Sequence, residues 1–263
     1  MATDLDGTIV RSDGAVAPRT LAAFRACAEA GVHVVFVTGR PVRWTAPLAA
    51  DAGLTQPVVC ANGAVVYDLG SERVLRRRAL PPAAVLTVAG RLREALPAIA
   101  FALESGSGFR RESGYVPRFD TGLEQAVGSL EDLLEHDPMV LKVLVRCPGQ
   151  SSDELLAVAR EAVDGVAHAT HSDPGGSLVE ISAAGVSKAS TLADLAAELG
   201  VGAAGVAAFG DMPNDLELLA WAGRGYAMAN GHPEAKAAAD SVAPPCEVDG
   251  VAQVIERLLA ARA

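Results

Sequence analysis

Short apolar runs alternate with amphipathic segments in the first part of the chain. A helical pattern begins at Pro18 and ends at Gly31, which stands where a C-cap glycine is expected. The continuous apolar run VHVVFV that follows is typical of a strand buried on both faces of a sheet. A second helix is expected from Pro41, and the pair Asn62-Gly63 between two apolar runs predicts a hairpin. This alternation favours an α/β sheet with crossover helices.

The last part of the chain repeats this alternation, whereas the middle differs from both ends. SKASTLADLAAELG and GVAQVIERLLAAR are typical of helices, and GVAAFG is typical of a buried strand. The middle begins at a Pro-Pro break and has more scattered apolar runs, AIAFALE, MVLKVLVRC and SLVEIS. We therefore predict a Rossmann-like, doubly wound parallel sheet built from residues 1–80 and 186–263, with an α+β domain inserted over residues 81–185.

The composition argues against several classes of protein, namely nucleic-acid-binding, membrane and secreted proteins. The 263 residues are 50% hydrophobic and carry a formal net charge of −10, which gives no reason to expect binding to nucleic acid or to an anionic membrane. No apolar run approaches the ~18 residues of a membrane helix, and no signal peptide is visible. The four cysteines lie far apart and never as CxxC, which suits buried thiols in a reducing compartment. We therefore expect a cytoplasmic protein that binds neither nucleic acid nor membranes.

Two carboxylates stand at the end of the first apolar run, in the segment DLDGT. Residues i and i+2 of a strand face the same side, so Asp4 and Asp6 are expected to point into one site at the carboxyl edge of the sheet. Gly7 allows a sharp turn there. A solvated strand end remains an alternative. A calcium-binding loop is disfavoured, because Thr8 and Ala15 stand where that loop needs carboxylate or amide ligands.

Three further segments place polar side chains after apolar strands or at helix starts. Thr38 follows VHVVFV and could offer its hydroxyl to an anion, although helix capping is the simpler explanation. Lys188 stands at a helix start, where a cation is disfavoured unless anions balance it, although a solvated lysine remains open. In FGDMPNDLELL, Asp211 and Asp215 can both face the strand ends, or can serve only the helix start. Four converging carboxylates would be costly without a cation, which favours Mg²⁺.

These segments together resemble the haloacid dehalogenase-like superfamily, and more closely its Cof-type, IIB branch. That superfamily is marked by DxDGT, a strand-ending Ser or Thr, a Lys and a GDxxxD motif, and this chain has all four in order. Phrases typical of the branch, TGRP, ANGA, GVSK, FGDMPND, AMAN and DGVA, also occur in order. The resemblance is strong in the outer parts and weak between Leu80 and Gly185, where the branch carries its C2-type cap domain.

The resemblance implies a role for each matching residue. Asp4 would be the nucleophile, and Asp6 would be the general acid and base. Mg²⁺ would be held by the carboxylates of Asp4 and Asp211 and by the backbone oxygen of Asp6. The remaining implied residues are Asp215 and Asn214 around the metal, Thr38, Gly39 and Lys188 at the phosphoryl group, and Arg40, Asn62 and Gly63 as possible substrate contacts.

The function that the resemblance implies is a Mg²⁺-dependent phosphatase of small phosphorylated metabolites, such as sugar, nucleotide or cofactor phosphates. It would form an aspartyl-phosphate and act as a monomer or homodimer. A phosphomannomutase-like phosphotransferase and a non-catalytic sensor of a phosphorylated ligand are the alternatives, and the intact Asp4 and Asp6 argue against the sensor. His168 and His171 form an HxxH pair, for which a solvated strand is expected rather than a metal site.

Overall fold

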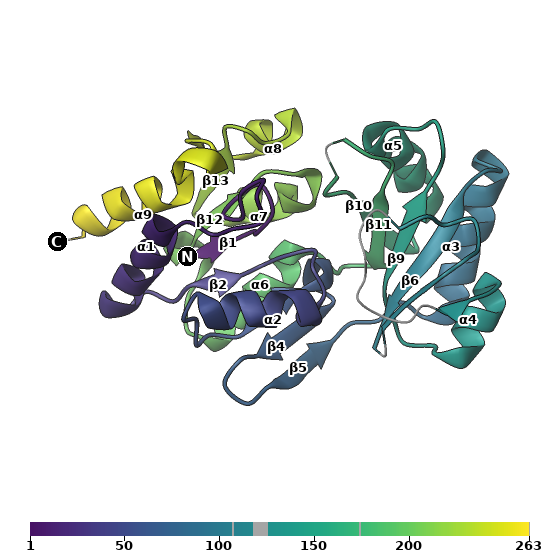
Figure 1. Ribbon diagram of the computed structural model, residues 1–263, viewed down its shortest axis with the longest axis horizontal. Coiled ribbons are helices and arrows are strands. Elements are labelled where there is room, and N and C mark those ends of the chain that lie inside the picture. The colour runs from purple at the N-terminus through teal and green to yellow at the C-terminus, as the bar shows by residue number, and fades with distance from the viewer. Residues whose placement is uncertain (107, 118–125, 174, 263) are drawn as a thin grey trace. The chain divides into compact units, whose positions relative to one another are not determined.

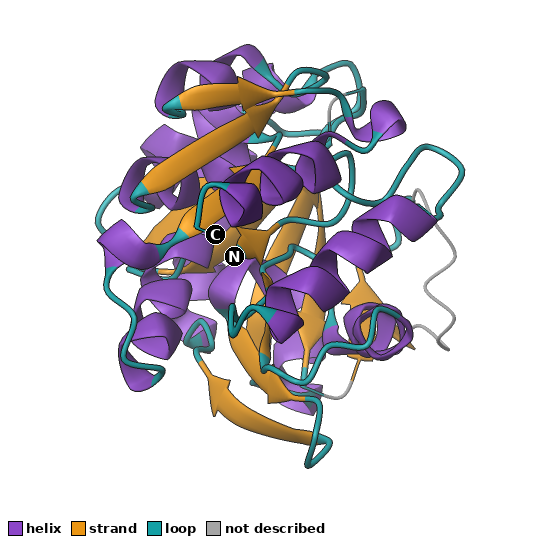
Figure 2. Cartoon of the chain, turned by 90° about the vertical axis from the view of Figure 1, so that its left-hand side faces the viewer, coloured by secondary structure: helices purple, strands orange, loops and turns teal. Residues whose placement is uncertain are grey.

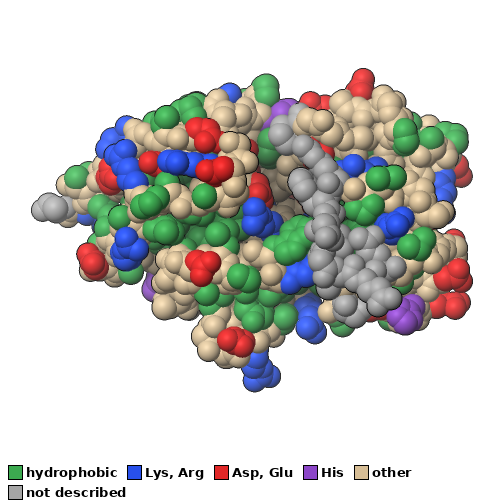
Figure 3. Space-filling model, viewed as in Figure 1, with side chains coloured by type: hydrophobic (Ala, Val, Ile, Leu, Met, Phe, Trp, Pro, Cys, Tyr) green, Lys and Arg blue, Asp and Glu red, His purple; other side chains and the backbone are tan. Residues whose placement is uncertain are grey.

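The computed structural model describes residues 1–106, 108–117, 126–173 and 175–262. The chain forms two compact units: a core unit of Met1–Arg76 and Ser187–Ala263, and an inserted unit of Arg77–Val186 (Figure 1). Within these described ranges, no helix combines the length and the apolar character needed to cross a bilayer. On the face drawn in Figure 3, Lys and Arg side chains lie beside Asp and Glu side chains.

A five-stranded parallel sheet forms the centre of the core unit, with strand order β14-β13-β12-β1-β2. A second sheet, in the order β3-β4-β5, contains the predicted hairpin, because β3 and β4 pair antiparallel. The strands are β1 (Ala2–Thr3), β2 (Val35–Phe36), β3 (Val58–Cys60), β4 (Val65–Asp68), β5 (Arg73–Arg77), β12 (Ala207–Gly210), β13 (Arg224–Met228) and β14 (Ser241–Ala243).

Helices cover both faces of the parallel sheet (Figure 2). On one face, Phe24 of the first helix meets Phe36 edge to face, with ring centroids 5.8 Å apart. On the other face, Val35 packs with Leu192 and Leu218, because alternate residues of a strand point to opposite faces. The doubly wound prediction is therefore confirmed. The helices are α1 (Pro18–Glu29), α2 (Val42–Asp51), α6 (Lys188–Glu198), α7 (Leu216–Trp221), α8 (Pro233–Ala238) and α9 (Gly250–Ala260).

The described residues of the inserted unit form a six-stranded sheet in the order β10-β11-β9-β6-β7-β8 and three helices. Its core combines alternate strand residues with helix residues, for example Phe101, Val143 and Ile181 with Leu92 and Leu155. All strand pairs are antiparallel except β7 with β8. The elements are α3 (Pro82–Ala95), β6 (Ala100–Ser105), β7 (Gly108–Arg111), β8 (Ala126–Val127), α4 (Leu130–His136), β9 (Val140–Arg146), α5 (Ser152–Val163), β10 (Ala167–Thr170) and β11 (Val179–Ala183).

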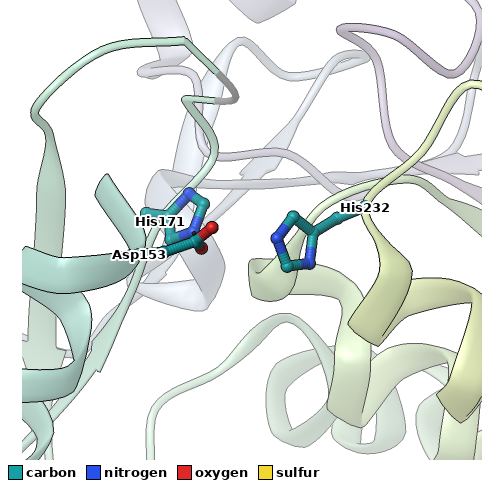
Figure 4. A group of neighbouring side chains, drawn as sticks. All are labelled: Asp153, His171 and His232. Atoms are coloured by element: carbon teal, nitrogen blue, oxygen red, sulfur yellow. Dashed lines mark hydrogen bonds and ion pairs between the residues drawn. The ribbon is translucent and has the colours of Figure 1, made fainter. Parts of the chain in front are cut away.

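His171 and the four cysteines are buried. His171 is 1% exposed, and its Nε2 lies 2.8 Å from Oδ1 of Asp153 (Figure 4). The expectation of a solvated strand is therefore wrong for His171, because β10 ends at Thr170 and the ring turns inward beside Asp153. His232, drawn in the same figure, belongs to the core unit. The four cysteines are free and buried, as predicted.

Candidate active site

The candidate site lies at the edge of the parallel sheet where β1, β2 and β12 end. Parallel strands end at a common edge, so Asp4 after β1, Thr38 after β2 and Asp211 after β12 come close together. The Asp4 N–H still donates to the Phe209 carbonyl, at 3.0 Å, which ties this position to β12. Asp4, Thr38 and Asp211 are all at least nine-tenths buried.

Lys188 is a buried cation between two carboxylates. Its Nζ donates to Oδ1 of Asp4 and to Oδ1 of Asp215, both at 2.7 Å, and the side chain is almost fully buried. Burial alone would lower the pKa of Lys188, but attraction to Asp215 and Asp4 outweighs it and the pKa is raised. The ammonium therefore stays charged at the start of α6, a position that is unfavourable for a cation without such partners.

The loop Asp211–Asp215 is built around one carboxylate. Oδ2 of Asp215 accepts hydrogen bonds from the N–H groups of Asp211, at 2.9 Å, and Met212, at 3.1 Å. A Cβ at Gly210 would lie 2.4 Å from Cγ of Asp215, so only glycine fits before Asp211. The other face of the loop is held by Thr8, whose hydroxyl donates to Oδ1 of Asp211 at 3.0 Å. The two motifs DLDGT and GDMPND are thus joined directly.

Three carboxylates gather at this edge in a way that fits a divalent cation. Oxygens of Asp4, Asp211 and Asp215 all lie within 4.8 Å of one another. Burial raises the pKa of Asp4 to about 7, against the opposing effect of Lys188, and burial together with Asp4 and Asp215 raises the pKa of Asp211. These groups therefore need positive charge to ionise. Lys188 supplies one charge, and a divalent cation with oxygen ligands would supply the rest.

Asp6 lies differently from its expected position. The chain leaves β1 after Thr3 and turns sharply, because the N–H groups of Thr8, Ile9 and Val10 all bond to the Leu5 carbonyl, so strand alternation does not extend to Asp6. The Asp6 side chain is 58% exposed and is held by the Arg40 guanidinium in a two-pronged ion pair, with Nε 2.8 Å from Oδ2. Asp6 is nonetheless near enough to Asp4 to contribute to its raised pKa.

The predicted phosphate-binding turn is compact. Oγ1 of Thr38 accepts a hydrogen bond from the Arg40 N–H at 3.1 Å, and the Thr38 N–H donates to the Val59 carbonyl at 2.8 Å. Thr38 and Gly39 therefore lie in a turn between β2 and α2, with their polar groups at the same sheet edge as Asp4.

Asn62, Gly63 and Asn214 lie in the interior rather than on an open surface. Asn62 is 2% exposed, and its Oδ1 accepts a hydrogen bond from Nδ2 of Asn214 at 3.1 Å. A Cβ at Gly63 would lie 2.2 Å from the Ser187 carbonyl oxygen, so this turn is packed against the start of α6. The structure thus brings Asn62 to the Asp211–Asp215 loop.

Asn230 lies at the site, although it is not among the site residues expected from the sequence. Its Nδ2 donates to the Gly7 carbonyl at 2.8 Å, and its Oδ1 accepts from the Cys246 N–H at 2.8 Å. The next residue, Gly231, approaches so closely that a Cβ there would lie 2.7 Å from the Asp211 carbonyl oxygen. An available signal was its position just after the strand RGYAM, the pattern that also marks Asp4, Thr38 and Asp211.

Comparisons with known proteins identify the family to which the chain belongs. A model of the haloacid dehalogenase-like hydrolase family matches residues 1–255. The 5-amino-6-(5-phospho-D-ribitylamino)uracil phosphatase YitU of Bacillus subtilis is 28% identical, over 97% of this chain and 96% of that protein. The phosphoglycolate phosphatase of Natronomonas pharaonis is also 28% identical, over 98% of this chain and 96% of its own.

A solved structure agrees with the fold. The subclass IIB sugar phosphatase BT4131 of the haloacid dehalogenase superfamily is 20% identical and superposes with a TM-score of 0.81, covering 98% of this chain and 97% of that chain. At this level of identity the likeness establishes the fold, which is the fold that the alternation of strands and helices predicts.

Proposed function

Because the chain belongs to the haloacid dehalogenase-like hydrolase family, we propose that it is a Mg²⁺-dependent phosphatase that hydrolyses small phosphorylated metabolites through an aspartyl-phosphate. The match to the family model confirms the family predicted from the sequence motifs. Similar proteins along almost the whole chain are phosphatases of small molecules, which supports the phosphoric monoester hydrolase class. The single observation that carries the proposal is the buried Lys188 ammonium, 2.7 Å from both Asp4 and Asp215, beside the three-carboxylate cluster.

The reaction would proceed in two steps. An oxygen of Asp4 attacks phosphorus in line, the phosphorus–oxygen bond to the leaving group breaks, and Asp6 donates a proton to the departing oxygen. Asp6 then takes a proton from the water that attacks the aspartyl-phosphate, which releases phosphate and restores Asp4. The exposed position of the Asp6 side chain suits this role, because it must reach an oxygen that leaves from the side opposite Asp4.

Positive charge around the phosphoryl group would come from Lys188 and from Mg²⁺. An ammonium has three N–H groups; two of those on Lys188 bind Asp4 and Asp215, and the third can bind a phosphoryl oxygen. The Thr38 hydroxyl and the backbone of Gly39 would bind further oxygens. Asp4, Asp211 and the backbone oxygen of Asp6 would hold Mg²⁺, which when bound supplies charge that offsets the phosphoryl group.

The inserted unit would act as the cap domain that selects the substrate. This is the sequence prediction for residues 81–185, and a cap of this size suits an enzyme that excludes water and large phosphoesters from its site. A cytoplasmic location and a monomeric or homodimeric state likewise stay predictions.

Phosphate release from a panel of phosphorylated metabolites tests the proposal. The panel should include phosphoglycolate and phosphorylated sugars, sugar alcohols and nucleotides, each with Mg²⁺ or EDTA. We expect Mg²⁺-dependent release that Asp4→Asn abolishes, and mass spectrometry of acid-quenched protein should find a phosphoryl group on the peptide that contains Asp4. Folded, Mg²⁺-loaded protein that releases no phosphate from any panel member would contradict the proposal. Turnover that needs a bisphosphate activator would favour the phosphotransferase instead.

A further inference from the structure

The turn between β3 and β4 has an unusual backbone. Ala61, Asn62 and Gly63 have successive φ angles of 51°, 55° and 100°, and all three residues are buried. The left-handed region is unfavourable for residues other than glycine, and such residues persist only where the surroundings hold them. An Asn-Gly hairpin turn accounts for the positive φ of Asn62 and Gly63. The positive φ of Ala61 is not explained in this way, which indicates that the surrounding structure holds the turn in place.

Backbone bonds join this turn to two parts of the site. The Asn62 N–H donates to the Thr38 carbonyl at 3.0 Å. On the other side, the Thr191 hydroxyl donates to the Gly63 carbonyl at 2.8 Å, which ties the turn to the helix that begins with Lys188. The turn therefore lies between the predicted phosphate-binding residues and the buried ammonium.

The Asn62 side chain reaches the third part of the site. Its Oδ1 accepts from Nδ2 of Asn214, which fixes the orientation of the Asn214 amide. Asn214 is 8% exposed, and its Oδ1 has no hydrogen-bond partner among the residues that the structure describes. A buried amide oxygen without a donor is costly, so this acceptor calls for a partner that is not a protein group. It belongs to the loop that carries Asp211 and Asp215, where a hydrated divalent cation would bring water donors.

We propose that Asn62 is a positioning residue for the metal site: it holds the Asn214 amide so that Oδ1 accepts a hydrogen bond from a metal-bound water. The inference rests on the Mg²⁺ site of the proposed function. Outer hydrogen-bond partners of this kind fix the geometry of a metal's ligands. Asn62 is thus assigned to metal binding through Asn214, in place of the substrate contact expected from the sequence.

Calorimetric titration of the metal-free protein with MgCl₂, without substrate, tests this assignment. Asn62→Gly keeps the backbone N–H and adopts the same φ without strain, but removes the acceptor for Asn214. We expect Mg²⁺ binding to weaken about 10-fold, at the lower end of the range for such outer partners, and Asn214→Ala to weaken it at least as much. The double variant should bind like Asn214→Ala alone, because both changes remove the same hydrogen bond to water. Saturating Mg²⁺ should restore kcat in Asn62→Gly.

Two further variants separate metal positioning from a general effect of the turn. Glu72→Gly is the matched control, since Glu72 also has a positive φ, 53°, but lies exposed in the turn between β4 and β5; its Mg²⁺ affinity should equal that of the wild type. Asn62→Asp keeps an acceptor oxygen and tolerates the left-handed conformation, so its Mg²⁺ affinity should not fall.

Failure of the Asn62 assignment can be distinguished from failure of the proposed function. Unchanged Mg²⁺ affinity in Asn62→Gly, additive losses in the double variant, or equal losses in Asn62→Gly and Asn62→Asp would each overturn the assignment of Asn62 while the proposed function stands. A wild-type protein that binds no Mg²⁺ would overturn both.

Discussion

Asp4→Asn should stabilise the metal-free protein at alkaline pH, although it removes the proposed nucleophile. Burial raises the pKa of Asp4 from 3.8 to about 7, because desolvation outweighs the attraction of Lys188, and Asp215 and Asp6 add repulsion. Between these pH values the folded protein keeps a proton on Asp4 that the unfolded chain has released. The stability that this proton supports is therefore complete below the unfolded-state pKa and is lost as pH rises through about 7.

The size of the change in the free energy of unfolding follows from the shift in the pKa of Asp4. A change from 3.8 to about 7, at about 1.36 kcal/mol per pKa unit, corresponds to about 4 kcal/mol. Asparagine resembles the protonated form of Asp4 and does not ionise. Relative to the wild type, the free energy of unfolding of Asp4→Asn should therefore rise by up to about 4 kcal/mol between about pH 4 and pH 8. This is an upper limit, because the charge of Asp4 also raises the pKa of Asp211, so the proton is not lost from Asp4 independently.

Urea-induced unfolding of both proteins in EDTA, at several pH values from about 4.5 to 8, measures this difference. Asp68→Asn is the flat control: hydrogen bonds from Ser71 lower the pKa of Asp68 below its ordinary value of 3.8, so its contribution to stability is already complete at about pH 4.5, and the difference between this variant and the wild type should stay constant across this pH range. If the difference between Asp4→Asn and the wild type stays flat or falls with pH, Lys188 rather than burial sets the charge of Asp4, and the reasoning is refuted.

Three further predictions concern the same cluster. Lys188→Met leaves Asp4 and its buried neighbours without their ammonium, and should lower the free energy of unfolding by roughly 3–5 kcal/mol in EDTA at pH 8 by urea titration; a loss below about 1 kcal/mol would contradict the burial argument. Gly7→Ala places a Cβ 2.3 Å from Oδ2 of Asp211 at a φ of 72°, whereas Gly14→Ala has a φ of 83° in open surroundings. Only Gly7→Ala should weaken Mg²⁺ binding in a calorimetric titration, and equal effects would show that backbone strain alone matters. Mg²⁺ should raise Tm more at pH 8 than at pH 6, because it binds the ionised carboxylates; an equal shift in a thermal melt would argue against a carboxylate site.

The site residues that could be predicted from the sequence are those that stand at strand ends. Asp4, Thr38 and Asp211 each follow a short apolar run, and parallel pairing of those runs brings the three positions to one edge. This inference needs only the type of each element and the direction of the sheet. The α1 and α2 helices and the β3–β4 hairpin were predictable for the same reason, since proline, glycine and apolar spacing are local signals.

The features of the site that could not be predicted depend on contacts between segments that are distant in the sequence. The direction of the Asp6 side chain depends on where β1 ends, which is decided by three N–H groups that share the Leu5 carbonyl. No local pattern shows that Asn62 meets Asn214, which lies 152 residues further along the chain. Asn230 has the same strand-end position as Asp4, but its bond to the Gly7 carbonyl appears only when β13 takes its place in the sheet.

The glycines of the motifs show why these segments act as one site. A Cβ at Gly7 would strike the Asp211 carboxylate, and one at Gly231 would strike the Asp211 backbone, at 2.3 Å and 2.7 Å. A Cβ at Gly210 would strike Asp215, at 2.4 Å from its Cγ, and one at Gly63 would strike the backbone at Ser187. Each glycine therefore allows one motif to approach another, in addition to any turn that it forms. These close approaches set the positions of the carboxylates and of Lys188. The distances between the charged groups of the site therefore depend on these four glycines as directly as on the charged residues themselves.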